Sequence, residues 1–313
     1  CTAAFNGFTD LYNTHEEPRI ITDDYKSTIS FVAKEKWMTQ KFYGKSHPAN
    51  NTSTKNLEFL TVEQALADLA HFIESIKASS DNFTASGVIL AGASYSASVA
   101  AWARMKYPHL VNGAWSSSGP MLAKMDFFEY NEVMTESIRA IGGKKCLRRI
   151  ENAFKQLEGF FADTEPKILL KIFTCDNFGW FQTMNSEKQI FGMKYPPIEY
   201  YTQLCADIFN NTSFMLIFPR FNFNSIKDNV DRTNKVLGGL NPNVTNVYFT
   251  HGQLDPWRAI GIQADLNPDT PAVVIDSYAH VPDLFPVSHK DTQQMKESKL
   301  RVKRLIRKWL REA

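Results

Sequence analysis

The sequence predicts an α/β fold, in which a parallel sheet carries its reactive side chains at the carboxyl ends of the strands. Three observations point to this class. An apolar run at 88–91 leads through very small residues into a helical pattern, with Ser94 in the turn between them. Two later strand patterns end in loops that contain Asp255 and His280. Reactive groups of α/β sheets gather at this edge of the sheet.

The turn around Ser94 is typical of a nucleophile elbow. Gly92 and Ala93 precede the serine directly after the apolar run. A nucleophile on a sharp strand-to-helix turn has a strained backbone, so its neighbours must be small. The helix directs N–H groups and the positive end of its dipole toward the serine, with the Tyr95 N–H as an oxyanion donor. A plain tight turn would contain the same small residues. The usual G-x-S-x-G pattern also ends in glycine, whereas its last position here is Ser96.

The order of the three candidate residues favours the elbow over the plain turn. The segment 244–250 is expected to form a strand ahead of Asp255, and 271–278 the next strand, directly ahead of His280. An α/β-hydrolase supplies its triad in the order serine, acid, histidine. Taken singly, each residue has an ordinary explanation. Asp255 would be a turn former before proline, and His280 would be a histidine whose side chain is hydrogen-bonded or exposed to solvent. Their agreement in order predicts an α/β-hydrolase with the triad Ser94, Asp255 and His280.

Several segments around and between these residues form a specific combination of motifs. They are 42–48, 60–68, 92–97, 100–109, 116–120, 255–261 and 279–284. Together they resemble the lysosomal serine peptidases that include Pro-Xaa carboxypeptidase, dipeptidyl-peptidase II and thymus-specific serine protease. The likeness extends with gaps from about Phe42 to the C-terminus. The Asp-Pro-Trp-x-Ala-x-Gly form of the acid loop is closest to the thymus-specific branch.

The resemblance implies a hydrolase domain formed by residues 1–122 and 236–313, with a mostly helical cap domain at 123–235 inserted between nucleophile and acid. Apolar residues recur at helical spacing in two stretches of the insert. A cap excludes water and shapes the substrate pocket. The N-terminal strands are expected to be incomplete, because the Gly-Gly-Glu-Gly of the family, which supplies the second oxyanion donor, has no counterpart at 1–41.

Aromatic residues in the insert form a candidate substrate pocket. Phe178, Trp180 and Phe181 could line a site for a proline ring, which stacks well on flat apolar faces. Ordinary packing in the core of the cap is the simpler explanation of these side chains.

The cysteines define a second feature of the insert. Four cysteines allow three full pairings. The resemblance implies a disulfide between Cys175 and Cys205. Cys146 then has no obvious partner except Cys1, and its alternative role is that of a small buried hydrophobe.

Composition agrees with a secreted or lysosomal enzyme. A net charge of +2, with basic and acidic residues mixed along the chain, predicts no nucleic-acid partner. No stretch approaches the roughly 20 apolar residues of a membrane helix, and no signal peptide opens the chain. Glycosylation sequons on predicted loops favour the secretory pathway. The sites expected to carry glycans are Asn51, Asn82, Asn210 and Asn243.

A basic amphipathic pattern occupies residues 295–312. Such a helix could lie on a membrane or bind calmodulin. The simpler interpretation is the last helix of a hydrolase, with its apolar stripe on the sheet and its lysines and arginines in solvent.

These features predict a serine exopeptidase that hydrolyses proline-containing peptides without a metal or other cofactor. The choice between carboxypeptidase and dipeptidyl-peptidase action stays open, and a homodimer is a possible assembly. Four departures from the family favour an alternative, a catalytically impaired or inactive relative: the missing Gly-rich loop, Thr39-Gln40-Lys41 in place of Glu-His-Arg, Ala93 in place of the usual glycine, and a short insert. A lipase or esterase is a third option, because triads recur across substrate classes.

Overall fold

The computed structural model describes residues 60–78, 87–157, 174–192, 196–209 and 221–312. These residues belong to two compact units. The insert unit contains Leu122–Gly239 and Leu254–Ile260. The sheet unit contains the described residues before Leu122, together with Leu240–Gln253 and the described residues from Gly261 onward. The predicted domain division at 123–235 differs from the insert unit chiefly at Leu254–Ile260, which the sequence analysis placed in the hydrolase domain.

The sheet unit has the α/β-hydrolase fold, built on a four-stranded parallel sheet in the order β1-β2-β5-β6. The strands are β1 (Ile89–Ala93), β2 (Gly113–Ser117), β5 (Val247–Gly252) and β6 (Ala272–Ile275). Ala93 pairs with Ser117, and Gly252 pairs with Ile275. The carboxyl ends of neighbouring strands are therefore aligned, and the loops that follow them start at one edge of the sheet.

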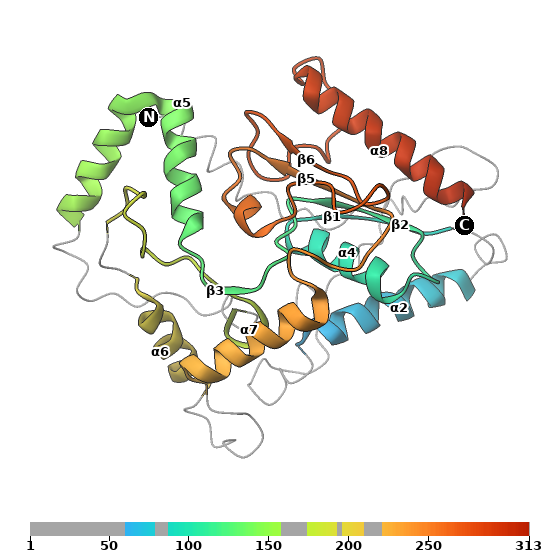
Figure 1. Cartoon of the computed structure of the whole chain (residues 1–313), viewed down its shortest axis with the longest axis horizontal. Coiled ribbons are helices and arrows are strands. Elements are labelled where there is room, and N and C mark those ends of the chain that lie inside the picture. The colour runs from blue at the N-terminus through green and yellow to red at the C-terminus, as the bar shows by residue number, and fades with distance from the viewer. Residues whose placement is uncertain (1–59, 79–86, 158–173, 193–195, 210–220, 313) are drawn as a thin grey trace. The chain divides into compact units, whose positions relative to one another are not determined.

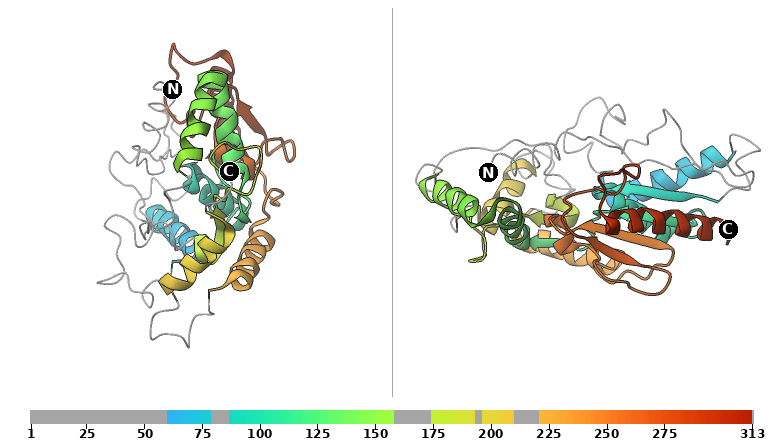
Figure 2. Two further views of the ribbon diagram at one scale, coloured as in Figure 1. Left: turned by 90° about the vertical axis from the view of Figure 1, so that its left-hand side faces the viewer. Right: turned by 90° about the horizontal axis from the view of Figure 1, so that it is seen from above.

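Helices cover both faces of this sheet (Figure 1). Residues Ile89 and Ala91 of β1 pack in one cluster with Val302 and Trp309 of α8 (Gln293–Arg311). Gly92, on the opposite face, meets α4 (Tyr95–Lys106), beside which lies α2 (Val62–Ala78). Alternate residues of a strand point to opposite faces, so an apolar run is buried on both sides. α8 packs its apolar side chains on the sheet and runs alongside the strands in the view from above (Figure 2), as the simpler interpretation of its pattern predicts.

The insert unit combines helices with a short parallel strand pair. Its elements are β3 (Lys124–Asp126), α5 (Glu129–Leu157), η3 (Thr174–Phe178), β4 (Gly179–Phe181), α6 (Ile198–Phe209) and α7 (Phe223–Leu237). β3 pairs with β4. The Asn234 side chain of α7 accepts a hydrogen bond from the Ala123 N–H at 2.9 Å and donates one to the Ala123 carbonyl at 2.7 Å. This amide joins α7 to the start of the strand pair.

The two predicted helical stretches of the insert are parts of α5, which is interrupted at Gly143. This glycine has φ 68° and ψ 175°, a conformation that residues with a side chain rarely adopt. The break separates the buried first half of α5 from a second half that contains Cys146. The change of direction therefore follows from the Gly-Gly pair at 142–143.

A disulfide links two elements of the insert unit. Cys175 of η3 and Cys205 of α6 are bonded, with their Cα atoms 5.6 Å apart, as the resemblance implies. Cys146 is also disulfide-bonded, so its interpretation as a free buried thiol is wrong. Cys1 lies outside the described residues, as do the segment 1–41 and three of the predicted glycan sites, Asn51, Asn82 and Asn210.

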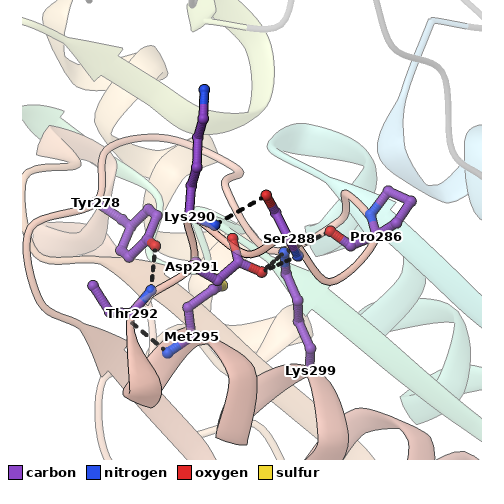
Figure 3. A network of polar contacts seen from close by, with 8 residues as sticks. All are labelled: Tyr278, Pro286, Ser288, Lys290, Asp291, Thr292, Met295 and Lys299. Atoms are coloured by element: carbon purple, nitrogen blue, oxygen red, sulfur yellow. Dashed lines mark hydrogen bonds and ion pairs between the residues drawn. The ribbon is translucent and has the colours of Figure 1, made fainter.

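A polar clamp fixes the segment that leads from β6 to α8 (Figure 3). Lys299 of α8 donates hydrogen bonds from Nζ to the Asp291 carboxylate at 2.8 Å and to the Pro286 carbonyl at 3.2 Å. The Ser288 N–H also donates to the Asp291 carboxylate, at 2.8 Å. The two charged side chains are only 6% and 11% exposed. The hydrogen bond from Lys299 holds the pKa of the Asp291 carboxyl below its usual range.

Replacing Lys299 with methionine is expected to lower the free energy of unfolding by about 1–3 kcal/mol at pH 7, because a nearly buried carboxylate loses its strongest donor. A lowered pKa stabilises the fold above the ordinary aspartate value of about 3.9, and this contribution is lost as the pH falls through the lowered value. The difference in Tm between variant and wild type should therefore narrow in melts from pH 7 toward pH 3. Lys303→Met, at an exposed position of the same helix, is the control. An equal loss in both variants would contradict the clamp.

Candidate active site

The turn between β1 and α4 has the backbone of a nucleophile elbow. Ser94 has φ 54° and ψ −127°, a strained combination for a residue with a side chain. Its hydroxyl makes no capping hydrogen bond to the helix. A Cβ added at Gly92 would lie 2.2 Å from the Ser96 carbonyl oxygen, so this position requires glycine. Both the strain and the need for small neighbours are predicted by the sequence around Ser94.

Ser96, which stands where the G-x-S-x-G pattern has its last glycine, stabilises this turn. Its hydroxyl accepts a hydrogen bond from the Ala93 N–H at 2.9 Å and donates one to the Ala93 carbonyl at 2.7 Å. The backbone of Ser94 is held from the other side, because its N–H donates to the Ser117 carbonyl of β2 at 2.9 Å. The departure from the pattern therefore leaves the turn intact and adds two hydrogen bonds to it.

Ser94 lies directly at the N-terminus of α4. Tyr95 is the first residue of the helix. The Ala97 N–H donates to the Ser94 carbonyl at 3.0 Å. Because a helix carries partial positive charge at its N-terminus, this end of α4 suits a developing oxyanion.

His280 follows β6 on a loop that the end of β2 holds in place. The side chain is half-buried. The next residue, Val281, has φ 54°, which is a genuine outlier for a β-branched residue. The Val281 N–H donates to the Ser118 hydroxyl at 2.9 Å. Ser94 and His280 thus both lie in the sheet unit, on loops that are hydrogen-bonded to neighbouring residues of β2 and its end.

A buried carboxylate that the sequence analysis did not select lies in the same loop. Asp283 is 1% exposed and accepts hydrogen bonds from three side chains of the sheet. Ser117 Oγ donates at 2.5 Å, Thr250 Oγ1 at 2.5 Å and Trp115 Nε1 at 3.1 Å. Only its place three residues after His280 could have drawn attention to it.

Asp255 belongs to the insert unit. Its side chain is fully buried, and Oδ1 accepts a hydrogen bond from the Trp257 N–H at 3.0 Å. The 3₁₀-helix η4 (Pro256–Ile260) follows directly. Two hydrogen bonds tie this loop to the insert: the Ser137 hydroxyl donates to the Leu254 carbonyl at 3.0 Å, and the Leu122 N–H donates to the Ile260 carbonyl at 2.9 Å.

The aromatic candidates of the insert differ in exposure. Phe178 and Phe181 are 0% and 3% exposed, which favours their alternative role as core. Trp180 is half-buried, stacks on Phe178 with ring centroids 4.3 Å apart, and donates from Nε1 to the Leu122 carbonyl at 2.8 Å. The ring centroids of Trp180 and Trp257 are 5.8 Å apart. Trp257 was not among the residues that the sequence singled out for this pocket. Trp180 and Trp257 therefore bring an aromatic surface next to the loop of Asp255.

Among the residues that the structure describes, no group of three or more histidine, cysteine or carboxylate side chains is placed to hold a metal ion. None of the helices in that part of the chain is long and apolar enough to cross a membrane.

Comparison with known proteins gives consistent matches. The serine carboxypeptidase S28 family matches residues 31–173 and 169–302. The thymus-specific serine protease of Mus musculus is 23% identical over 389 residues, which cover 88% of this chain and 74% of that protein. The lysosomal Pro-X carboxypeptidase of Mus musculus is 35% identical over 147 residues, covering 44% of this chain and 29% of that protein. Among solved structures, a proline iminopeptidase of Mycobacterium smegmatis covers 86% of this chain and 78% of its own, with 13% identity and a TM-score of 0.38.

Proposed function

The chain belongs to the serine carboxypeptidase S28 family, and from this premise we propose that it is a serine peptidase that hydrolyses proline-containing peptides with the triad Ser94, Asp255 and His280. The observation that carries the proposal is the strained backbone of Ser94 between β1 and α4. Such strain persists only where the surrounding structure enforces it, and it clusters at functional sites. The loop of His280 is hydrogen-bonded to the same strand end.

In the proposed reaction, Ser94 Oγ attacks the carbonyl carbon of the scissile amide while His280 takes the hydroxyl proton. The tetrahedral oxyanion receives a hydrogen bond from the Tyr95 N–H. His280 then gives the proton to the leaving amine, and Asp255 holds the imidazole in the required tautomer and stabilises its charged form. Water then attacks the carbonyl carbon of the acyl-enzyme while His280 takes a proton from it, and His280 returns that proton to Ser94 Oγ as the bond to the acyl group breaks.

The aromatic surface of Trp180 and Trp257 is the proposed contact for the proline ring. Both side chains are partly exposed, unlike Phe178 and Phe181. A proline ring is rigid and apolar, so it binds to an aromatic face without losing rotamer freedom. Within the insert unit, these indoles lie beside the loop of Asp255.

A lysosomal or secreted location is part of the proposal. Asn243 begins a sequon, and its side chain is exposed, as glycosylation requires. The disulfide between Cys175 and Cys205 fits an oxidising compartment. A relative named for its lysosomal location, the Pro-X carboxypeptidase of Mus musculus, is consistent with it.

Labelling with a fluorophosphonate probe tests this proposal. The glycosylated wild type is expected to be labelled and the Ser94→Ala variant to remain unlabelled, because the probe reports an activated serine next to a working oxyanion site. Matched peptides with proline or alanine beside the scissile bond, and an ester substrate, then define the substrate class. A folded wild type that takes no label would contradict the proposal and favour an inactive relative. Hydrolysis of the ester alone would favour an esterase.

A further inference from the structure

Three strained residues lie at the carboxyl edge of the sheet, and hydrogen bonds connect them. Ser94, Ser118 and Val281 have φ values of 54°, 56° and 54°. The Ser94 N–H donates to the Ser117 carbonyl, and the Val281 N–H donates to the Ser118 hydroxyl. The Ser118 N–H in turn donates to the Thr250 carbonyl of β5 at 2.7 Å. The nucleophile turn and the histidine loop are therefore both attached to two consecutive residues at the end of β2.

Asp283 completes this arrangement from the side of the histidine loop. Ser117, whose carbonyl holds the Ser94 backbone, donates its hydroxyl proton to Asp283 Oδ1. Thr250 and Trp115 donate to Oδ2. Both carboxyl oxygens of Asp283 therefore accept hydrogen bonds from side chains of the sheet. Ser117 thus contacts the nucleophile turn through its backbone and the histidine loop through its side chain.

The cost of this carboxylate indicates a role beyond general stability. A buried carboxylate is unfavourable unless it is hydrogen-bonded, and no ion pair to Asp283 occurs among the residues that the structure describes. An apolar side chain would fill the same space without that cost. Fully satisfied buried polar networks instead select one arrangement of the groups they join. Here the joined groups are two loops, each of which carries a residue of the proposed triad.

We propose that Asp283 is a positioning residue: by binding Ser117, Thr250 and Trp115 it keeps the loop of His280 in the strained conformation at Val281, and so fixes the imidazole relative to Ser94. The inference rests on the proposed function. Asp283 does not touch the reacting atoms. Its contribution is the placement of the general base, and a misplacement of about 1 Å can lower a rate about 100-fold.

The clamp at the far end of the same loop supplies a matched control. Asp291, like Asp283, is a nearly buried aspartate after β6, but its hydrogen bonds come from Lys299 and Ser288 and none of them reaches the sheet edge. Asp291→Asn should therefore lower Tm while leaving kcat per folded molecule unchanged. A purely structural role of Asp283 would make Asp283→Asn behave in the same way.

The expected result for Asp283→Asn is a fall in kcat of about 10–100-fold with KM changed less than about threefold, because the base is misplaced while substrate contacts remain. Thr250→Val, which removes one donor at nearly constant volume, should lower kcat several-fold. Thr250→Ser, which keeps the hydroxyl, should restore most of it. A wild-type kcat in Asp283→Asn, or an equal loss in Asp291→Asn, would overturn the inference.

Amide hydrogen exchange separates this inference from the proposed function. Exchange at the Val281 N–H, which donates to Ser118, should be faster by about tenfold or more in Asp283→Asn and unchanged in Asp291→Asn. This readout needs no activity. A wild type that takes no fluorophosphonate label would end the proposed function, while unchanged exchange at Val281 in Asp283→Asn would end the positioning role.

Discussion

If the proposed triad is correct, Asp255→Asn is expected to lower kcat/KM toward proline-containing peptides about 10³–10⁴-fold, because the amide would favour the wrong tautomer of His280 and leave its imidazolium without a counter-charge. The fold should survive the change. Asparagine keeps the Oδ1 acceptor that receives the Trp257 N–H at 3.0 Å. Steady-state kinetics, together with the rate of fluorophosphonate labelling at Ser94, measure the effect. Both rates should fall while Tm changes little.

Asp265→Asn is the matched control for this experiment. Asp265 Oδ1 also accepts a backbone N–H, that of Ala272 at 2.7 Å, but the residue is exposed and lies outside the proposed triad. Its kcat/KM is expected to equal that of the wild type. If Asp255→Asn retains full activity beside this control, Asp255 is not the acid of the triad.

Gly92→Ala is expected to abolish labelling of Ser94 and to destabilise the sheet unit. The added Cβ would lie 2.2 Å from the Ser96 carbonyl oxygen and 2.6 Å from the Ala97 nitrogen. These are backbone atoms of the first turn of α4, so they cannot move aside without displacing the helix that follows the nucleophile. Overpacking of this kind costs about 1–3 kcal/mol and more where backbone must shift. Thermal melts and probe labelling, measured on the same sample, report both effects.

The neighbouring position provides the comparison. Ala93→Gly removes a single methyl group from the residue directly before Ser94. The substitution keeps both hydrogen bonds between the Ser96 hydroxyl and the backbone of residue 93. We expect labelling close to that of the wild type. Strong labelling of Gly92→Ala would show that α4 can shift without loss of the oxyanion site, contrary to the elbow geometry described for Ser94.

Local patterns account for the parts of the site that the sequence predicted. The turn at Ser94 was predictable because its strand, its small residues and its helix are contiguous. The end of β5 was not predictable. Its last two residues, His251 and Gly252, belong to the strand, although the sequence there is typical of a loop. They pair with Val274 and Ile275 of β6, and such pairing is invisible in a single segment.

Long-range contacts explain what the sequence could not supply. Asp283 acquires its role from Ser117, 166 positions away in the chain. The exposure of the insert aromatics depends on strand parity: in β4 (Gly179–Phe181), Phe181 points inward and Trp180 to the other side. Composition alone treats these two residues alike. Assignment of Leu254–Ile260 to the insert unit likewise depends on partners such as Ser137, which lies on α5.

The packing of the acid loop on the insert has a consequence for how such enzymes diverge and can be recombined. Ile260 shares a cluster with Phe127 and Tyr130, and Trp257 packs against both of those rings. An insert exchanged between homologues would therefore bring foreign partners to Leu254–Ile260. Chimeras should carry this heptapeptide together with 122–239, and in natural lineages substitutions at Phe127 or Tyr130 should be accompanied by compensating changes at Trp257 or Ile260.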